Sequence, residues 1–412
     1  MTAGRGGGRS LARAFKEPME ARQDVFESGY KLVVVGSGFF GATIAHKVAT
    51  ELDLPVLVLE QRDHIGGNAY SEFDGETGIE VHRYGSHLFH TSNAEVWQFL
   101  NRFTGFNNYR HRVFTRHRSR TYTMPINLMT INAFFGLDLS PGEAREFIAR
   151  QAAAEAIERP RNLEEKAISL IGRPLYEAFV RSYTAKQWEV DPTQLPADII
   201  TRLPVRFSFN DFYFQDAYEG LPLIGYTELF RKMLTHERIR TVTRCDFFKA
   251  RPALPKAVPI VYTGPIDRYF EYRFGELGWR TLDFEVERLP VEDYQGASVV
   301  NYPDPEYGFT RIHEFKHLHP ERKYGAGTVI MREFSRFARR GDEPYYPIGR
   351  PDDKDRYERY RELAEAEDNV IFGGRLGTYR YLDMHQAIAA ALRAYEAKVA
   401  PLLTNGKVGC PA

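Results

Sequence analysis

The sequence is short of cysteine, of net charge and of long apolar runs, and each shortage excludes a class of protein. It has 2 cysteines in 412 residues, Cys245 and Cys410, so a disulfide framework or a thiolate zinc site is excluded and a reducing, cytoplasmic location is expected. Lys and Arg total 55, as do Asp and Glu, which argues against nucleic acid as a partner bound through bulk positive charge. No apolar run reaches the roughly 18–20 residues of a membrane helix, so no membrane partner is expected.

The rest of the composition is that of a folded protein with ample core. Hydrophobic residues make up 43% of the chain and charged residues 27%, which excludes global disorder. Aromatic residues reach 14%, a high value that hints at a surface on which planar groups stack. Residues 1–29 are rich in Gly and Arg, with no periodicity and no apolar stretch, so we expect a disordered tail and no secretion signal.

A β-α-β unit opens the ordered part of the chain. The apolar runs 31–35 and 56–59 predict buried parallel strands, and residues 42–52 between them have helical spacing. Short apolar runs at 258–263 and 370–372 are long enough to return to the same sheet. The predicted fold class is therefore α/β, with a discontinuous Rossmann-like domain, to which the segments described below add a helical insertion domain and an antiparallel β-sheet domain.

The turn between the first strand and the helix carries a nucleotide-binding pattern. Gly36, Gly38 and Gly41 form G-x-G-x-x-G, and Glu60 ends the second strand. In such units the glycines allow the tight turn, the approach of a pyrophosphate and close helix packing, while the acid accepts hydrogen bonds from a ribose. The pattern predicts dinucleotide binding; the alternative is a glycine-rich turn that binds nothing.

Two further glycine-rich stretches favour FAD over NAD. The pair Gly66-Gly67 follows the acidic residue and suits a cofactor that extends further across the sheet. Residues 373–377 precede Asp383 and Gln386, whose spacing predicts a capped helix start. The positive end of that helix would favour the negatively charged edge of a reduced flavin. The alternative is a loop that leads into a packing helix.

Helical and strand-like segments interrupt this domain. Capping-box patterns at 92–95 and 140–143 begin helices, and 163–184 has helical spacing. Alternating stretches, which predict antiparallel strands, lie at 206–210, 297–302 and 310–315. The predicted division is a tail at 1–29, an FAD-binding domain at 30–105, 221–265 and 351–400, a helical domain with a mobile loop at 130–204, and a sheet domain at 106–129, 205–220 and 266–350.

Histidines and arginines supply the candidate polar groups. No carboxylate or cysteine near His82, His87 and His90 completes a metal site, so no metal is predicted; His82 and His90 are expected to form hydrogen bonds in a loop, and His87 is placed to reach a flavin ring. Aromatic residues crowd around Arg202 and Arg311. They belong to the core, or they stack a base while the arginines bind a diphosphate. For Arg311 the alternative is an ion pair.

Five stretches of the sequence together resemble bacterial UDP-galactopyranose mutases. They are residues 35–42, 64–70, 84–91, 183–188 and 374–384. The similarity covers about residues 30–395, and its most specific parts are Lys186-Gln187-Trp188 and Tyr381-Leu382-Asp383-Met384. The resemblance implies FAD, active when reduced, and interconversion of UDP-galactopyranose and UDP-galactofuranose through a covalent adduct between flavin N5 and the anomeric carbon of the sugar.

The resemblance also implies roles for individual residues. The implied cofactor contacts are Gly36, Gly38, Phe40, Gly41, Glu60, Gln61, Gly67, Asn68, His87, Val242, Arg375, Leu382, Asp383, Met384, Gln386 and Ile388. The implied substrate contacts are His111, Phe179, Tyr183, Thr184, Trp188, Arg202, Tyr213, Asn301, Arg311, Tyr346 and Tyr381. His87, Arg202 and Arg311 are the catalytic candidates, with Arg202 on a loop (191–202) that closes on the diphosphate. His111 departs from the pattern, because the family has an asparagine there.

Two other functions stay open at this point. A flavin amine-oxidase-like oxidoreductase shares the nucleotide-binding unit, but it needs a hydride donor and would consume oxygen during turnover. A non-catalytic FAD-binding scaffold would not need Arg202 and Arg311 together. The sequence is compatible with a homo-oligomer and with UDP-galactose as the small-molecule partner.

Overall fold

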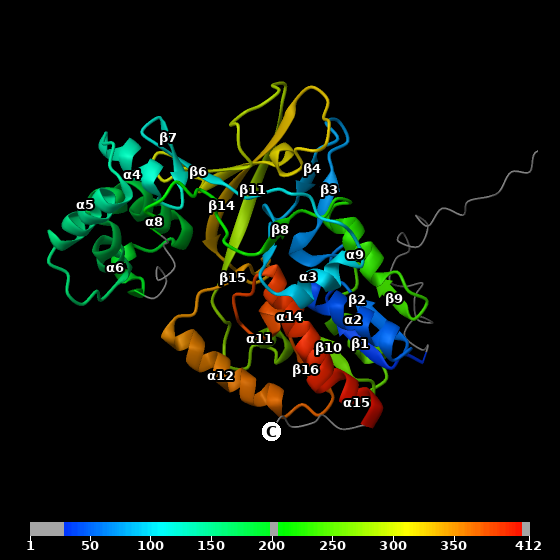
Figure 1. Cartoon of the computed structure of the whole chain (residues 1–412). Helices are drawn as coiled ribbons and strands as arrows, with labels where there is room; N and C mark the ends of the chain where they lie inside the picture. The colour runs from blue at the N-terminus through cyan, green and yellow to red at the C-terminus, as the bar shows by residue number, and fades with distance from the viewer. Residues whose placement is uncertain (1–28, 198–204, 406–412) are drawn as a thin grey trace, which may run out of the picture. The chain divides into compact units, whose positions relative to one another are not determined.

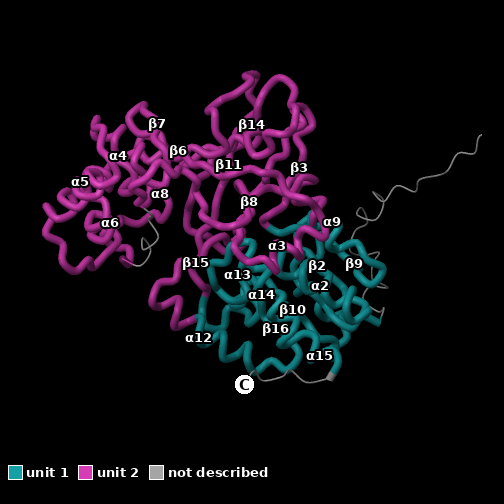
Figure 2. Tube along the Cα trace, viewed as in Figure 1, with its two compact units in different colours: residues 1–67, 230–275, 357–412 teal, residues 68–229, 276–356 magenta. Residues whose placement is uncertain are grey.

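The computed structural model describes residues 29–197 and 205–405 (Figure 1). These residues form two compact units (Figure 2): unit 1 comprises the described residues of 1–67, 230–275 and 357–412, and unit 2 comprises those of 68–229 and 276–356. Arg202 and all but the last residue of the predicted tail at 1–29 lie outside the described residues. Within the described ranges, no helix combines the length and the apolar character needed to cross a bilayer.

Unit 1 is built on a five-stranded sheet in the order β16-β10-β1-β2-β9. Its strands are β1 (Leu32–Val35), β2 (Val56–Leu59), β9 (Ile239–Val242), β10 (Ile260–Tyr262) and β16 (Val370–Phe372). All neighbouring strands are parallel, and β1 and β2 are buried throughout, as expected for strands covered on both faces. The predicted strands and the return of 258–263 and 370–372 to the first sheet are confirmed.

Helices complete unit 1 around this sheet. Helix α2 (Phe39–Glu51) contacts β1, β2 and α14 (Met384–Ala394) (Figure 1). Asp383 and Gln386 form the predicted capping box at the start of α14. The remaining helical elements are α9 (Tyr226–Leu234) and α12 (Pro351–Glu365), each of which runs from one unit into the other, and α10 (Phe247–Ala250), η7 (Arg251–Ala253), α11 (Ile266–Tyr269), α13 (Gly374–Gly377), η9 (Tyr395–Val399) and α15 (Ala400–Asn405).

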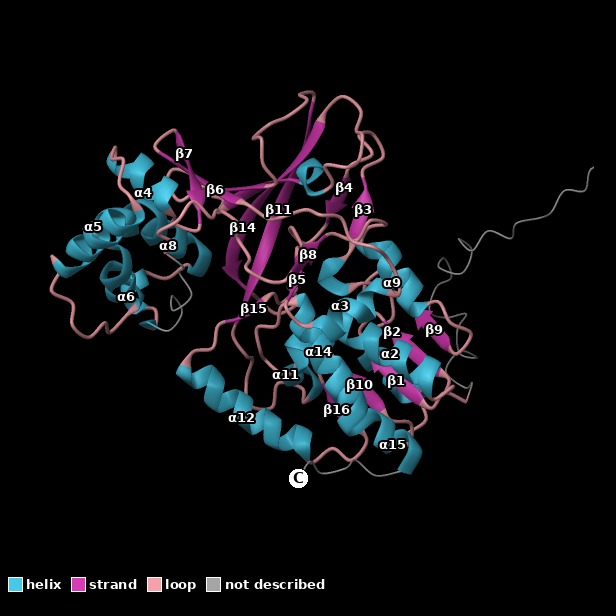
Figure 3. Ribbon diagram, in the orientation of Figure 1, coloured by secondary structure: helices cyan, strands magenta, loops and turns pink. Residues whose placement is uncertain are grey.

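Unit 2 contains a seven-stranded sheet in the order β15-β11-β14-β13-β12-β6-β7 (Figure 3). Its strands are β6 (Val113–His117), β7 (Arg120–Met124), β11 (Trp279–Leu289), β12 (Val299–Asn301), β13 (Arg311–Glu314), β14 (Thr328–Phe337) and β15 (Tyr346–Pro347). β12 and β6 pair in parallel, and the other neighbours are antiparallel. The strands predicted at 297–302 and 310–315 are therefore confirmed.

Smaller elements flank this sheet. Two short ribbons pair β3 (Ser71–Phe73) with β4 (Glu80–His82), and β5 (Phe89–Thr91) with β8 (Tyr218–Gly220). The helices are η3 (Gly67–Ala69, at the unit boundary), α3 (Ala94–Asn101), α4 (Leu128–Phe135), α5 (Pro141–Ala153), α6 (Leu163–Ile171), α7 (Arg173–Leu175), η4 (Tyr176–Arg181), α8 (Ser182–Trp188), η5 (Pro192–Gln194) and η8 (Phe315–Leu318). The three-domain division stays a prediction, although 68–105 lies in unit 2.

Helix starts in unit 2 follow local capping chemistry. Ser140 and Glu143 form the predicted capping box of α5. At 92–95 the prediction is wrong by one residue, because Asn93 is the N-cap and its side chain accepts from the backbone N–H groups of Glu95 and Val96. Asn is as good an N-cap as Ser, so the pattern alone does not separate two neighbouring candidates.

The predicted strand at 206–210 is wrong. This segment is a loop, because the Arg206 guanidinium donates to the backbone carbonyls of Asn210 (3.3 Å), Phe212 and Tyr213 (3.3 Å). The chain therefore turns around one side chain instead of pairing with a strand. Phe209 is 65% exposed, so the alternation of aromatic and polar residues does not mark a buried face.

Candidate functional site

Two glycines of the turn in unit 1, Gly36 and Gly41, have no room for a side chain. A Cβ on Gly41 would lie 2.0 Å from the Gly36 carbonyl oxygen and 3.0 Å from Val34 Cγ1. Gly36 has φ +100°, and its Cβ would lie 2.1 Å from Thr263 Oγ1. Gly38 is the N-cap of α2 without a side-chain cap, and the first turn holds no acidic residue. The N–H groups at this helix start are therefore suited to bind phosphate.

Glu60 completes this turn from the carboxyl end of β2. Its side chain is 5% exposed, and Oε2 accepts from the Ser37 backbone N–H (3.0 Å) and from Ser37 Oγ (2.7 Å). Oε1 accepts from the Arg62 backbone N–H (3.0 Å). A Cβ on Gly67 would lie 3.2 Å from Gly38 Cα. A buried carboxylate fixed beside a glycine-rich turn fits the ribose and pyrophosphate of a dinucleotide.

Arg311 is the centre of a second cluster, in unit 2. It begins β13, donates to the Tyr183 hydroxyl on α8, and places Nε 3.3 Å from Glu333 Oε1. Burial disfavours the charged guanidinium, but the Glu333 carboxylate and the neighbouring tyrosines, Tyr183 foremost, together outweigh this and raise the pKa of Arg311. The ion pair considered above exists, yet 32% of the Arg311 side chain is exposed. Its position therefore leaves part of the guanidinium accessible to an anion.

Glu333 is itself held by a group of hydrogen-bonded side chains. Glu333 is 4% exposed, and its carboxylate lies 3.1 Å from His313 Nε2 and 3.3 Å from Thr310 Oγ1. His313 Nδ1 lies 2.8 Å from Ser86 Oγ. Burial favours the neutral acid, but Arg311 and His313 lower the pKa of Glu333 to about 2. The carboxylate is thus ionised at neutral pH, and it fixes the guanidinium.

Comparison with known proteins identifies the family. A sequence profile described as "GLF: UDP-galactopyranose mutase" matches residues 178–381, and one described as "NAD(P)-binding Rossmann-like domain" matches 34–103. The "Probable UDP-galactopyranose mutase" of Klebsiella pneumoniae is 42% identical over 366 residues, which cover 88% of this chain and 93% of that protein. The chain belongs to the UDP-galactopyranose mutase family.

One further relative and one solved structure are also similar to this chain. The "dTDP-fucopyranose mutase" of Escherichia coli is 40% identical over 367 residues, 88% of this chain and 96% of that protein. A solved structure described as "Crystal structure of reduced UDP-Galactopyranose mutase" has a TM-score of 0.66 at 15% identity and covers 92% of this chain and 100% of its own, which shows the shared fold. Membership in the UDP-galactopyranose mutase family makes the chain an isomerase and does not favour an oxidoreductase.

The other predicted cofactor residues of this mutase lie in both units. In unit 1, the positions are Phe40 within α2, Gln61 after β2, Val242 at the end of β9, and Leu382, Asp383, Met384, Gln386 and Ile388 before and within α14. Gln61 Oε1 accepts from Arg268 (3.2 Å). Arg375 Nη2 donates to the Leu382 carbonyl (2.6 Å), and its guanidinium stands 5.1 Å from the centre of the Tyr381 ring. Asn68 and His87 lie in unit 2.

The aromatic residues predicted on the uridine side of the mutase divide into two groups. Tyr183 and Trp188 lie on α8, and both are half-buried. Phe179 is 6% exposed and its ring lies 5.1 Å from Tyr122 and 5.3 Å from Phe134. Phe179 thus belongs to the core of the helical part, and Thr184 is buried as well.

His111, the departure from the family pattern, is 3% exposed. Its Nδ1 lies 3.0 Å from the Tyr109 hydroxyl, and its ring stands 5.5 Å from that of Tyr213. Asn301 faces Arg311 in the β12–β13 register, and in the described structure its Oδ1 is buried without a hydrogen-bond partner. Tyr346 lies on β15 opposite Arg280.

His87 is fixed by its own loop and by His82. Its Nδ1 lies 2.8 Å from the Gly85 carbonyl oxygen, and its backbone N–H donates to His82 Nδ1 (3.0 Å). His90 Nδ1 lies 2.7 Å from Asp216 Oδ2. The expected hydrogen bonds of His82 and His90 are therefore confirmed, but the expected loop is wrong, because His82 ends β4 and His90 lies in β5.

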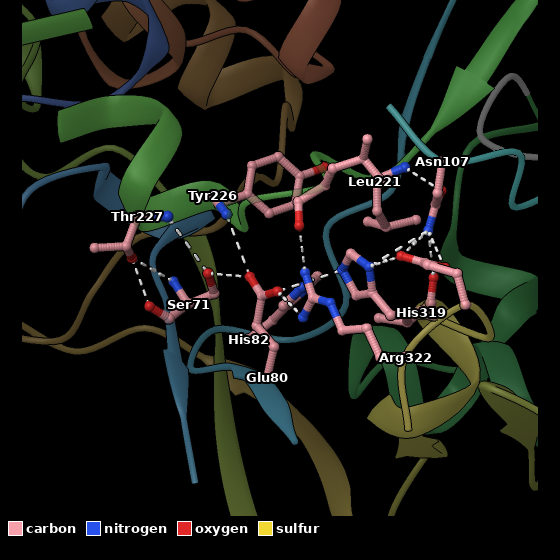
Figure 4. A network of polar contacts seen from close by, with 12 residues as sticks. Ser71, Glu80, His82, Asn107, Leu221, Tyr226, Thr227, His319 and Arg322 are labelled. Atoms are coloured by element: carbon pink, nitrogen blue, oxygen red, sulfur yellow. Dashed lines mark hydrogen bonds and ion pairs between the residues drawn. The ribbon is translucent and has the colours of Figure 1, made fainter. Parts of the chain in front are cut away.

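A polar network next to His82 escaped the sequence analysis (Figure 4). The buried Glu80 carboxylate accepts from Arg322 Nη1 (2.7 Å) and Ser71 Oγ (2.6 Å), and it lies 3.3 Å from His319 Nε2. A Cβ on Gly225 would lie 2.5 Å from this carboxylate. No local pattern marks the network, because its members come from segments far apart in the sequence.

One carboxylate–histidine group in unit 2 has the spacing of a metal site. Ligand atoms of Asp293, Glu314 and His317 lie within 4.8 Å of one another. However, Glu314 accepts from Thr328 Oγ1 (2.7 Å) and from the Gln295 backbone N–H (2.9 Å), and His317 lies 3.3 Å from Asp293. Hydrogen bonds within the protein already account for this group.

Two buried histidines make the folded protein sensitive to acid. Burial lowers the pKa of His82 and of His111 to about 3, from an ordinary value of 6.5. Between these values the unfolded chain binds protons that the folded chain does not, so the free energy of unfolding falls as pH falls, by about 1.4 kcal/mol per pH unit and group. Above about pH 6.5 this loss is absent.

We therefore expect the unfolding temperature to drop between about pH 7 and about pH 5, and to drop less in His111→Asn. Calorimetry of both proteins at several pH values measures the difference. The same pH dependence in the variant and the parent would show that His111 takes up no proton on unfolding.

Proposed function

We propose that this protein is an FAD-dependent UDP-galactopyranose mutase that interconverts UDP-galactopyranose and UDP-galactofuranose. The observation that carries the proposal is Arg311, a charged guanidinium held by the buried Glu333 and the Tyr183 hydroxyl, in a family member whose other unit carries a dinucleotide-binding turn. Reduced FAD, when bound, supplies the nucleophile for a reaction without net redox change.

The protein's own residues bind and orient the cofactor and the nucleotide sugar. Gly36, Gly38, Gly41 and Glu60 fit the dinucleotide, with the other cofactor residues named above completing its site. Arg311 binds the diphosphate through charge-assisted hydrogen bonds and leaves the sugar free to react. The proposed contacts further include Tyr183 and Trp188 on the uridine, Tyr346 and Tyr381 on phosphate oxygens, Asn301 near the sugar, and Phe179, Thr184, His111, Tyr213 and His87 as additional positions. Arg202 stays a proposed second arginine, outside the described residues.

A second nucleotide sugar is a candidate, because a dTDP-fucopyranose mutase is nearly as similar to this chain. UDP-galactose is the proposed substrate, and dTDP-fucose is the alternative. A cytoplasmic location and a homo-oligomeric state also stay proposals; the first is supported by the scarcity of cysteine.

Spectroscopy and turnover test the function together. The purified protein is expected to be yellow, to bleach with dithionite, and to convert UDP-galactofuranose to UDP-galactopyranose only after reduction. Chromatography of the nucleotide sugars measures conversion, and dTDP-fucofuranose is assayed in parallel. Oxygen consumption during turnover would point to an oxidoreductase. A colourless protein that FAD does not reconstitute would refute the cofactor assignment, and preference for the dTDP sugar would correct the substrate.

A further inference from the structure

Lys186, on helix α8, is surrounded by main-chain oxygens. Its Nζ donates to the carbonyl of Tyr302 and lies 3.0 Å from that of Asp304 and 3.1 Å from those of Tyr307 and Phe309. An ammonium has three N–H donors, so these four acceptors use its whole hydrogen-bonding capacity. No part of the nucleotide-sugar chemistry proposed above uses this lysine.

The four carbonyls belong to one loop, residues 302–310, which connects β12 to β13. The Tyr302 backbone N–H donates to the Thr310 carbonyl (2.9 Å) and closes the loop at its base. Asn301 ends β12 immediately before the loop, and Arg311 begins β13 immediately after it. The loop is therefore joined directly to both proposed substrate contacts.

Helix α8 carries the third proposed contact. Tyr183 precedes Lys186 by three residues, so their side chains emerge on the same face of the helix, and the Tyr183 hydroxyl accepts from Arg311. The carboxyl end of α8 is attached separately, because the Gln187 carbonyl accepts from Ser335 Oγ (2.8 Å) and the Trp188 carbonyl from Arg280 Nη1 (3.2 Å). Lys186 thus joins two elements that both contact substrate in the proposed site.

We propose that Lys186 is a positioning residue whose ammonium holds loop 302–310 against α8 and thereby sets the spacing of Tyr183, Asn301 and Arg311. This inference rests on the proposed function for the roles of these three residues. The geometry itself, four carbonyls around one ammonium, does not depend on it. Burial lowers the pKa of Lys186 to about 8, with Asp304 and Glu306 acting in the opposite direction, so the group is charged at neutral pH.

Chemical rescue tests the inference. Lys186→Ala removes three methylene groups and the ammonium. Added propylammonium has three carbons and an ammonium, so it can fill the space that the side chain leaves. We expect the variant to keep its flavin and to exchange the amide hydrogens of 302–310 faster. UDP should bind roughly 10- to 100-fold more weakly, because displacement of Arg311 weakens its own charge-assisted hydrogen bonds to the diphosphate. Propylammonium should restore UDP affinity with a saturable concentration dependence, whereas 1-propanol, which has the same shape without charge, should not. Lys166→Ala, on α6, is the matched control and is expected to bind UDP as the parent does.

Several outcomes would overturn the inference. Parental UDP affinity and amide exchange in Lys186→Ala would do so, as would equal rescue by 1-propanol. If Lys186→Ala does not fold, Lys186→Met keeps the aliphatic stem, and parental UDP affinity in that variant would show that packing alone places the loop. Amide exchange is measured without substrate, so failure of the parent to convert UDP-galactose refutes the proposed function and leaves this test intact.

Discussion

Arg311→Ala is expected to lose nearly all turnover while keeping its flavin. Each charge-assisted hydrogen bond to the diphosphate contributes about 1.5–3 kcal/mol, so each bond lost weakens UDP binding roughly 10- to 150-fold. The change also leaves the Glu333 carboxylate, 4% exposed, without its guanidinium partner. The flavin is expected to be retained because the two partners of Arg311 described above, Tyr183 and Glu333, are not among the residues proposed for the cofactor.

Calorimetric titration with UDP, the kcat and KM of the mutase reaction and the flavin spectrum measure these effects. Arg311→Lys keeps the charge but not the planar fork, and it is expected to fall between the parent and Arg311→Ala. Arg288→Ala is the control, because Arg288 is 54% exposed and pairs with Asp74 at 2.6 Å elsewhere in unit 2. If Arg311→Ala binds UDP as tightly as the parent, the guanidinium serves only its ion pair with Glu333.

Gly41→Ala is expected to yield protein without flavin. The added Cβ would lie 2.0 Å from the Gly36 carbonyl oxygen, and this neighbour is backbone within the phosphate-binding turn, so it cannot rotate away. Overpacking of a core typically costs about 1–3 kcal/mol, and we expect the upper end here. Displacement of the turn would also disturb the N–H groups at the start of α2.

The ratio of flavin to protein absorbance and the unfolding temperature report this change. Gly75→Ala is the matched control, since no atom lies within 4 Å of a Cβ at that position, and it should retain both values. Full flavin content in Gly41→Ala would mean that the turn binds no dinucleotide, or that it adapts to a side chain at no cost.

The parts of this fold that were predictable are those encoded within one segment. The strand 32–35, the turn at Gly36–Gly41 and the capping box at Asp383 each depend on neighbours along the chain, and each is observed. Such signals arise from burial of apolar runs, backbone conformation and N–H groups at a helix start. The dinucleotide side of the site could be found in this way.

The support of Arg311 could not be found from the sequence. Glu333 reaches Arg311 because β13 and β14 pair in one register, Arg311 opposite Glu333, and a strand's own residues do not specify its partner's register. The strand predicted at 206–210 was wrong for a related reason. The Arg206 side chain donates to the backbone carbonyls of Asn210, Phe212 and Tyr213, and the alternation of polar and apolar residues does not reveal these bonds. Long-range strand pairing determines the surroundings of Arg311, and side-chain-to-backbone hydrogen bonds determine the conformation of 206–210.

The central pairing of the nucleotide-binding sheet joins distant parts of the chain. β1 is bonded to β10, in a register that pairs Val35 with Tyr262, and β10 is bonded to β16 at Val370–Phe372. Unit 2 is encoded largely between these strands. During synthesis on the ribosome, an amino-terminal fragment with an intact G-x-G-x-x-G turn therefore contains β2 but lacks β10 and β16 on the other side of β1. Cofactor capture is therefore expected only after β16 has emerged, and a protein truncated before Val370 should be flavin-free despite carrying the complete fingerprint.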